Sequence, residues 1–155
     1  MSPSRPIAAE GRILGIDYGG RRIGIAVSDP TRTIAQGQTT LLVRGFDDAV
    51  RQVLSTVAQW DAVCIVLGLP LTLRGDEGDI ARTVRRFAAT LARKDAPPVV
   101  FADERLTSAQ ATRALREMGQ TGDKAAVDRA AATLLLQTAL DTRAWERAAP
   151  PVMGT

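Results

Sequence analysis

The chain alternates between short apolar runs and longer amphipathic segments. Apolar runs bounded by turn residues predict strands at 12–17, 22–28, about 37–43, 62–67 and 99–102. Apolar residues at helical spacing predict helices at about 46–59, 79–94, 107–118 and 126–143.

The order of these elements predicts the fold class. Three consecutive strands favour an antiparallel meander, and the two strands that follow, each after a helix, favour parallel attachment through right-handed crossovers. The continuous apolar run at 62–67 is typical of a strand covered on both faces. The sequence therefore predicts an α/β fold: a mixed five-stranded sheet, three antiparallel strands then two parallel, with helices on both faces.

The helical spacing also predicts which helix faces are buried. In the segment 79–94 the expected buried stripe is Ile80, Val84, Phe87 and Leu91. In the segment 126–143 it is Ala130, Ala131, Leu134, Leu135, Ala139 and Leu140. The alanines would let this last helix lie close to the sheet.

The length of 155 residues fits one domain. We expect this domain at 12–143, with a flexible arm at 1–11 and a flexible tail at 144–155. The arm lacks the apolar stretch of a secretory signal, and no apolar run approaches membrane-spanning length. The single cysteine, Cys64, lies in an apolar run. It is expected in the core of a protein from a reducing compartment, by default the cytoplasm.

Composition limits the chemistry. The chain has no histidine, which excludes histidine general bases and histidine metal sites, and one cysteine cannot build a structural zinc site. Carboxylates remain as ligands, and oxygen ligands suit Mg²⁺ or Mn²⁺. The formal net charge is +3, and all but two of the 20 basic residues are arginines. Arginine binds phosphate in a fork geometry, so a polyanionic partner is one interpretation and a compositional bias the other.

Asp17 is the most informative residue. It ends the apolar run at 12–16 and precedes a glycine-containing hairpin turn. A carboxylate in a central strand is costly to bury unless positive charge meets it, which favours a metal or phosphate site. The alternative is that the strand ends at Ile16 and Asp17 is a solvated turn residue.

Two further acids would reach the same edge of the sheet. Asp103-Glu104 ends the last strand, and Asp128 begins the last helix. Taken singly, each has an ordinary interpretation: Asp128 complements the helix dipole, and Glu104 is a solvated partner of Arg105. Ligands gather at the carboxyl ends of strands in such sheets. Together the three acids predict a metal site held by carboxylates.

Four motifs resemble one family. They are Asp17-Tyr18-Gly19-Gly20-Arg21-Arg22-Ile23-Gly24-Ile25-Ala26-Val27-Ser28-Asp29, then Gly68-Leu69-Pro70-Leu71 with Gly75, then Asp103-Glu104-Arg105-Leu106-Thr107-Ser108, and Asp128 with Ala131-Ala132. In this order and at this spacing, over about residues 12–141, they resemble the YqgF family. That family is also called RuvX and is related to Holliday junction resolvases. The resemblance implies a ribonuclease H-like fold, which agrees with the order of elements.

The resemblance also implies an active site. Asp17, Glu104 and Asp128 would be the catalytic acids and the ligands of one or two Mg²⁺ or Mn²⁺ ions. With two ions, Asp17 would bridge them. The expected activity is that of a hydrolase acting on ester bonds, a metal-dependent nuclease. Arg22, Arg105 and Lys124 are the candidates for contact with substrate phosphates.

One departure affects the expected substrate. The wider resolvase superfamily carries a second acid three residues after the first on its last helix, and here that position is Ala131. Whether Asp123, Asp103 or Asp29 supplies a fourth ligand stays open. This departure weakens the case for junction resolution. The resemblance also implies a role in maturing the 5′ end of precursor 16S ribosomal RNA, which we expect as the function, with junction resolution or DNA repair as the alternative. With 4% aromatic residues, binding should rest on phosphates, whether of RNA or DNA.

Two other classes of function stay open. A non-catalytic nucleic-acid-binding module would use the same fold without cleaving. The actin-like sugar and acetate kinases also open with Asp-x-Gly, so an actin-like ATP-binding half-domain is another alternative. Those kinases need two such domains, and this length supplies one. No membrane partner is expected, and the sequence leaves the oligomeric state open.

Overall fold

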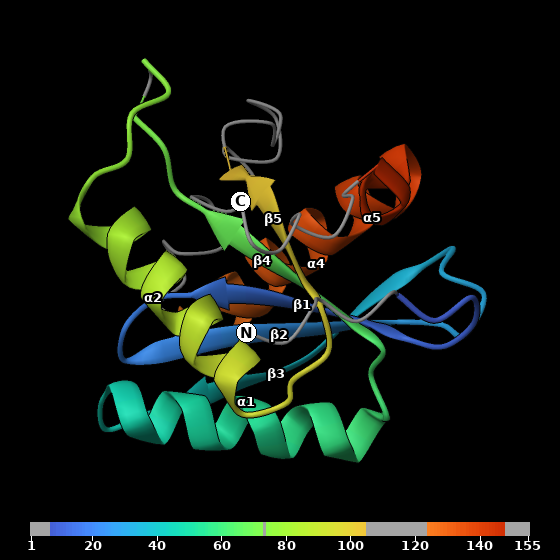
Figure 1. Cartoon of the computed structure of the whole chain (residues 1–155), viewed down its shortest axis with the longest axis horizontal. Helices are drawn as coiled ribbons and strands as arrows, with labels where there is room; N and C mark the ends of the chain where they lie inside the picture. Colours follow the sequence, from blue (N-terminus) through green and yellow to red (C-terminus); the bar gives the residue numbers. More distant parts are fainter. Residues whose placement is uncertain (1–6, 73, 105–123, 148–155) are drawn as a thin grey trace.

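The computed structural model describes residues 7–72, 74–104 and 124–147. Its five strands form one sheet in the order β3-β2-β1-β4-β5 (Figure 1). They are β1 (Ile13–Tyr18), β2 (Arg22–Ser28), β3 (Ala35–Leu42), β4 (Cys64–Leu69) and β5 (Val99–Asp103). The helices are α1 (Phe46–Trp60), α2 (Asp79–Arg93), α4 (Lys124–Thr142) and the short α5 (Ala144–Arg147). The helix expected at 107–118 lies outside the described residues.

The sheet is mixed, as the order of elements predicts. β1 pairs with β2 and β2 with β3 in antiparallel register, whereas β1 pairs with β4 and β4 with β5 in parallel register. β1 is the central strand, and within it Asp17 lies opposite Gly24 of β2. Asp17 is half-buried within the strand, so the interpretation of a strand ending at Ile16 is wrong.

One face of the sheet is covered by α1 and α2, as the ribbon shows (Figure 1). The core on this face includes Leu14, Ile16, Val53 and Phe87, and Phe87 packs against the rings of Tyr18 and Phe46. The buried stripe of α2 contains Val84, Phe87 and Leu91 as expected. The prediction for Ile80 is wrong, because its exposed fraction is 64% and Ala81 is buried instead. The helical spacing is compatible with either residue, and packing against the sheet selects the smaller one.

The other face is covered by α4, which lies across β1, β2 and β3. Its buried residues are Ala132, Leu135, Leu136, Ala139 and Leu140. The prediction for Ala130, Ala131 and Leu134 is wrong, because these residues are not fully buried, and the helix is rotated relative to the expected stripe. The close approach depends on glycines of the sheet as well as on helix alanines. A Cβ built on Gly15 of β1 would lie 2.7 Å from the Cβ of Leu136.

Order extends beyond the expected domain at both ends. Ile7 packs against the core under α4, and the Arg32 side chain donates hydrogen bonds to the carbonyls of Ala8 and Gly11. At the other end, residues 144–147 form α5 because Trp145, only 7% exposed, completes that same core. The chain therefore packs past both expected boundaries, 12 and 143.

Cys64 begins β4 and is fully buried, as a core cysteine should be. Burial raises the pKa of its thiol to about 12, so the thiolate is suppressed. Among the described helices, none combines the length and the apolar character that crossing a membrane requires.

Candidate functional site

Three acids from three elements meet on the α4 side of the sheet. Asp17 belongs to the central strand β1, Glu104 directly follows β5, and Asp128 belongs to α4. Asp128 is the fifth residue of α4 as described, one turn inside the helix, so complementing the helix dipole does not account for its position. The contacts among these acids define the site.

Asp17 and Glu104 share a hydrogen bond. Burial raises the pKa of Asp17 to about 6, and the negative charge of Asp128 adds to the effect. Burial also raises the pKa of Glu104 to about 7, with further contributions from the charge and hydrogen bond of Asp17 and the charge of Asp103. The hydrogen bond lowers the pKa of Asp17 and raises that of Glu104, so Glu104 is the donor. Near neutral pH this pair therefore retains a proton that two exposed carboxylates would have lost.

Asp128 faces a cation from the neighbouring strand. The Nε atom of Arg22, at the start of β2, lies 2.8 Å from Oδ2 of Asp128. The contact is an ion pair without hydrogen-bond alignment, and this buried Oδ2 accepts no hydrogen bond within the described part of the chain. Arg22 therefore compensates the charge of Asp128 but leaves this oxygen with unused capacity as an acceptor.

Two glycines flank Asp17 on the adjacent strands. On β2, a Cβ at Gly24 would lie 2.0 Å from the main-chain oxygen of Asp128. On β4, a Cβ at Gly68 would lie 2.7 Å from Oε1 of Glu104. The missing side chains create the space that brings α4 and Glu104 next to Asp17. The absence of a side chain at Gly24 therefore permits close packing of the backbones of β2 and α4.

A hydroxyl holds the first turn of α4 near the site. Oγ1 of Thr40, opposite Gly24 on β3, donates a hydrogen bond of 2.7 Å to the carbonyl of Ala125. Sequence reasoning missed the positioning roles of Thr40 and Gly68. A glycine inside an otherwise apolar strand was the available signal for Gly68, and nothing in the local pattern marks Thr40.

The remaining candidate residues have different positions. Lys124 is exposed at the start of α4, and Asp103 is near enough to raise the pKa of Glu104. Asp29 follows β2 at the opposite end of that strand from Arg22, where its carboxylate accepts hydrogen bonds from Thr31, Thr33 and Ile34. These bonds lower the pKa of Asp29, and the distance along the strand excludes it as a fourth ligand. Arg105 and Asp123 lie outside the described residues.

The donors present suit a hard divalent cation. All three acids offer oxygen, the charge of Asp128 disfavours that of Asp17, the charge of Asp17 disfavours that of Glu104, and Asp128 contributes a buried oxygen that accepts no hydrogen bond within the described residues. Within residues 7–72, 74–104 and 124–147, no three acidic, cysteine or histidine side chains are already grouped around one ion position. In the arrangement observed, Glu104 is turned to Asp17, and Asp128 to Arg22.

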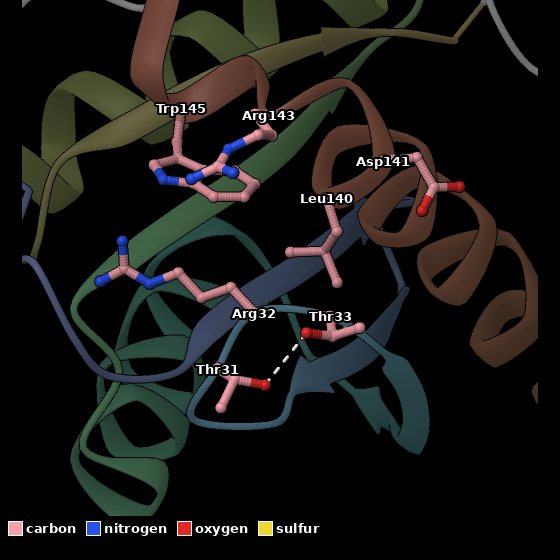
Figure 2. Close-up of a pocket in the computed structure, with 7 residues that line it drawn as sticks. All are labelled: Thr31, Arg32, Thr33, Leu140, Asp141, Arg143 and Trp145. Carbon is pink, nitrogen blue, oxygen red and sulfur yellow. Dashed lines mark hydrogen bonds between the residues drawn. The ribbon is translucent and has the colours of Figure 1, made fainter.

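A separate cavity of about 260 Å³ lies at the other end of α4. Figure 2 shows Arg32 and Arg143 near Trp145, and Thr31, Thr33 and Asp141 also line the cavity. The arginines are already engaged: Arg32 with main-chain carbonyls and Arg143 with Glu146, and both guanidinium groups lie about 5.9 Å from the indole centre. Both arginines of this cavity therefore already have partners within the fold, and Asp17, Glu104 and Asp128 remain the candidate site.

Solved structures with the same architecture define the class of fold. One is RuvC of T. thermophilus in complex with a Holliday junction substrate, with a TM-score of 0.58 at 18% identity, covering 86% of this chain and 95% of that one. Another is the yeast mitochondrial Holliday junction resolvase Ydc2, with a TM-score of 0.57 at 12% identity, covering 94% and 83%. The fold is that of the ribonuclease H-like resolvases.

Sequence comparison identifies the family. Residues 11–142 match the family described as RuvX: Holliday junction resolvase. A relative from Koribacter versatilis (strain Ellin345) is 44% identical over 147 residues, covering 94% of this chain and 96% of its own. One from Rhodococcus jostii (strain RHA1) is 43% identical over 153 residues, covering 92% and 86%. Both carry the name "Putative pre-16S rRNA nuclease". The chain belongs to the RuvX family, and the expected resemblance is confirmed.

Proposed function

We propose that Asp17, Glu104 and Asp128 form the metal-binding active site of a nuclease, which hydrolyses phosphodiester bonds. The observation that supports this best is the meeting of three acids from three elements: the charge of Asp128 raises the pKa of Asp17, and Asp17 accepts a hydrogen bond from Glu104. Such a cluster is unfavourable by itself and becomes favourable beside a divalent cation. Family and fold support the nuclease class.

Each side chain has a defined task in this proposal. Asp17, on the central strand of the sheet, would be the central ligand, and Glu104 and Asp128 would complete the site. One or two Mg²⁺ or Mn²⁺ ions would supply Lewis-acid activation of water and stabilisation of charge on the phosphate. Asp17 and Glu104 hold one proton in the hydrogen bond between them. This proton must be released before both carboxylates can bind a cation. Lys124, exposed at the start of α4, and Arg105 are proposed to contact substrate phosphates, as is Arg22 once it is free of Asp128.

The proposed substrate is the precursor of 16S ribosomal RNA, cleaved in maturing its 5′ end. A relative that carries this name is 44% identical and matches 94% of this chain. Such processing would occur in the cytoplasm, where ribosomes are assembled. A four-way DNA junction is the second candidate, favoured by the family description and by RuvC bound to its junction.

The test compares the wild-type protein with Asp17→Asn on labelled precursor RNA, single-stranded DNA and a four-way junction, in Mg²⁺ or Mn²⁺. Asp47→Asn, an exposed acid on α1, is the matched control. We expect cleavage by wild type and control and none by Asp17→Asn. Undiminished cleavage by Asp17→Asn would refute the assignment. Binding without cleavage would support a non-catalytic module, and ATP turnover an actin-like half-domain.

A further inference from the structure

The ion pair between Arg22 and Asp128 lies where the proposed site needs a cation. Oδ2 of Asp128 is the atom that Arg22 approaches to 2.8 Å, and it is also the buried oxygen without a hydrogen-bond donor in the described chain. A divalent ion and the guanidinium would therefore compete for one oxygen. Their like charges would also repel each other at this range.

Local structure holds Asp128 in place without help from Arg22. The main chain of α4 at Asp128 rests on Gly24, and the first turn of the helix is tied to Thr40. Arg22, by contrast, belongs to the first residue of β2, and its side chain is 40% exposed while that of Asp128 is 21% exposed. The guanidinium can thus withdraw into solvent while the main chain that carries Asp128 keeps its position.

We infer that Arg22 is a placeholder cation, which occupies Asp128 in the metal-free protein and must withdraw from it when a divalent ion binds. This inference rests on the proposed metal site. Arg22 then lowers the affinity for metal while keeping the empty site electrostatically tolerable. A carboxylate that faced only the other acids would be strongly disfavoured in its charged form.

The test is direct titration of metal-free protein with Mn²⁺, following free Mn²⁺ by electron paramagnetic resonance, without nucleic acid. We expect Arg22→Gln to bind Mn²⁺ about three- to tenfold more tightly than wild type, the effect of losing one partly exposed ion pair and one nearby positive charge. Arg22→Lys keeps the charge and should stay close to wild type. Arg21→Gln is the matched control, because it removes the same charge from an exposed side chain one position away.

The outcomes separate this inference from the proposed function. The metal site itself is refuted if wild type binds no Mn²⁺, or if Asp17→Asn binds Mn²⁺ as wild type does. If that site exists but Arg22→Gln binds Mn²⁺ as wild type does, or only as much more tightly as Arg21→Gln, the placeholder role is overturned. Weaker binding by Arg22→Gln overturns it too, because Arg22 would then position Asp128 for the ion. Thermal unfolding of each variant checks folding, and Arg22→Met, which also removes the charge, replaces Arg22→Gln if the glutamine variant is unstable.

Discussion

Replacing Gly24 by alanine should damage the fold and the site together. The added Cβ would lie 2.0 Å from the main-chain oxygen of Asp128, whereas ordinary contacts begin at 3.4 Å. The obstructing atom belongs to a helix backbone rather than to a flexible side chain, so α4 must move away from β2 by more than 1 Å, on the order of the missing contact distance. The movement carries Asp128 with it.

The magnitude follows from two opposing effects. Overpacking of this kind costs about 1–3 kcal/mol. Loss of unfolded-state freedom on replacing glycine offsets about 0.4–1 kcal/mol of that cost. We therefore expect a net loss of about 0–2.6 kcal/mol in the free energy of unfolding. Because a displacement of about 1 Å at a catalytic group can cost a factor on the order of 10², cleavage should fall far more than stability.

Urea denaturation measures the first effect, and Mn²⁺-dependent cleavage of labelled RNA measures the second. Gly78→Ala is the matched control, because nothing lies within 4 Å of its added Cβ and its φ is −90°. If Gly24→Ala retains the stability and the cleavage rate of Gly78→Ala, the close packing of α4 on β2 does not hold Asp128, and this reasoning fails.

Three further predictions concern pH, packing and the second glycine. The folded-state pKa values of Asp17 and Glu104 are raised to about 6 and about 7, so the metal-free protein should lose stability as pH rises from about 4 to about 7. Asp17→Asn should then be more stable than wild type at pH 8 by roughly 1–3 kcal/mol in urea denaturation, and an equal pH dependence in the two proteins would contradict the pairing. Gly68→Ala should lower cleavage less than Gly24→Ala does, because its added Cβ meets the movable carboxylate of Glu104; a loss as large as that of Gly24→Ala would show that Glu104 cannot adjust. Trp145→Ala should lower stability by about 2–4 kcal/mol in thermal unfolding, whereas a change below about 0.5 kcal/mol would mean that α5 contributes no core.

Much of the fold was predictable because connectivity favours particular pairing directions. Apolar runs joined directly favour antiparallel pairing, and runs joined through helices favour parallel crossovers, which predicts the mixed sheet but not the order of its strands. The exact helix faces were less predictable. Ile80 and Ala81 both satisfy the spacing of α2, and α4 is turned by the glycines beneath it. The burial of Trp145 depends on a core built from distant segments, which local pattern does not reveal.

The site was predictable in its location but not in its charge state. Topology alone brings the ends of β1 and β5 to one edge of the sheet, which predicts Asp17 and Glu104 as neighbours. The hydrogen bond between them and the pairing of Arg22 with Asp128 depend on side-chain geometry. Sequence reasoning therefore treated Arg22 as a residue for the substrate alone, whereas the structure shows it engaged with an acid. The roles of the acids as metal ligands stay a prediction.

The three acids of the proposed site are divided unequally between the sheet and α4. Asp17 and Glu104 are carried by the sheet, whereas Asp128 arrives on a helix that packs across β1, β2 and β3. A fluctuation that lifts this helix would remove one acid and leave the other two in place. The fraction of molecules competent for chemistry is then set by a local opening equilibrium, which amide hydrogen exchange along α4 would measure directly.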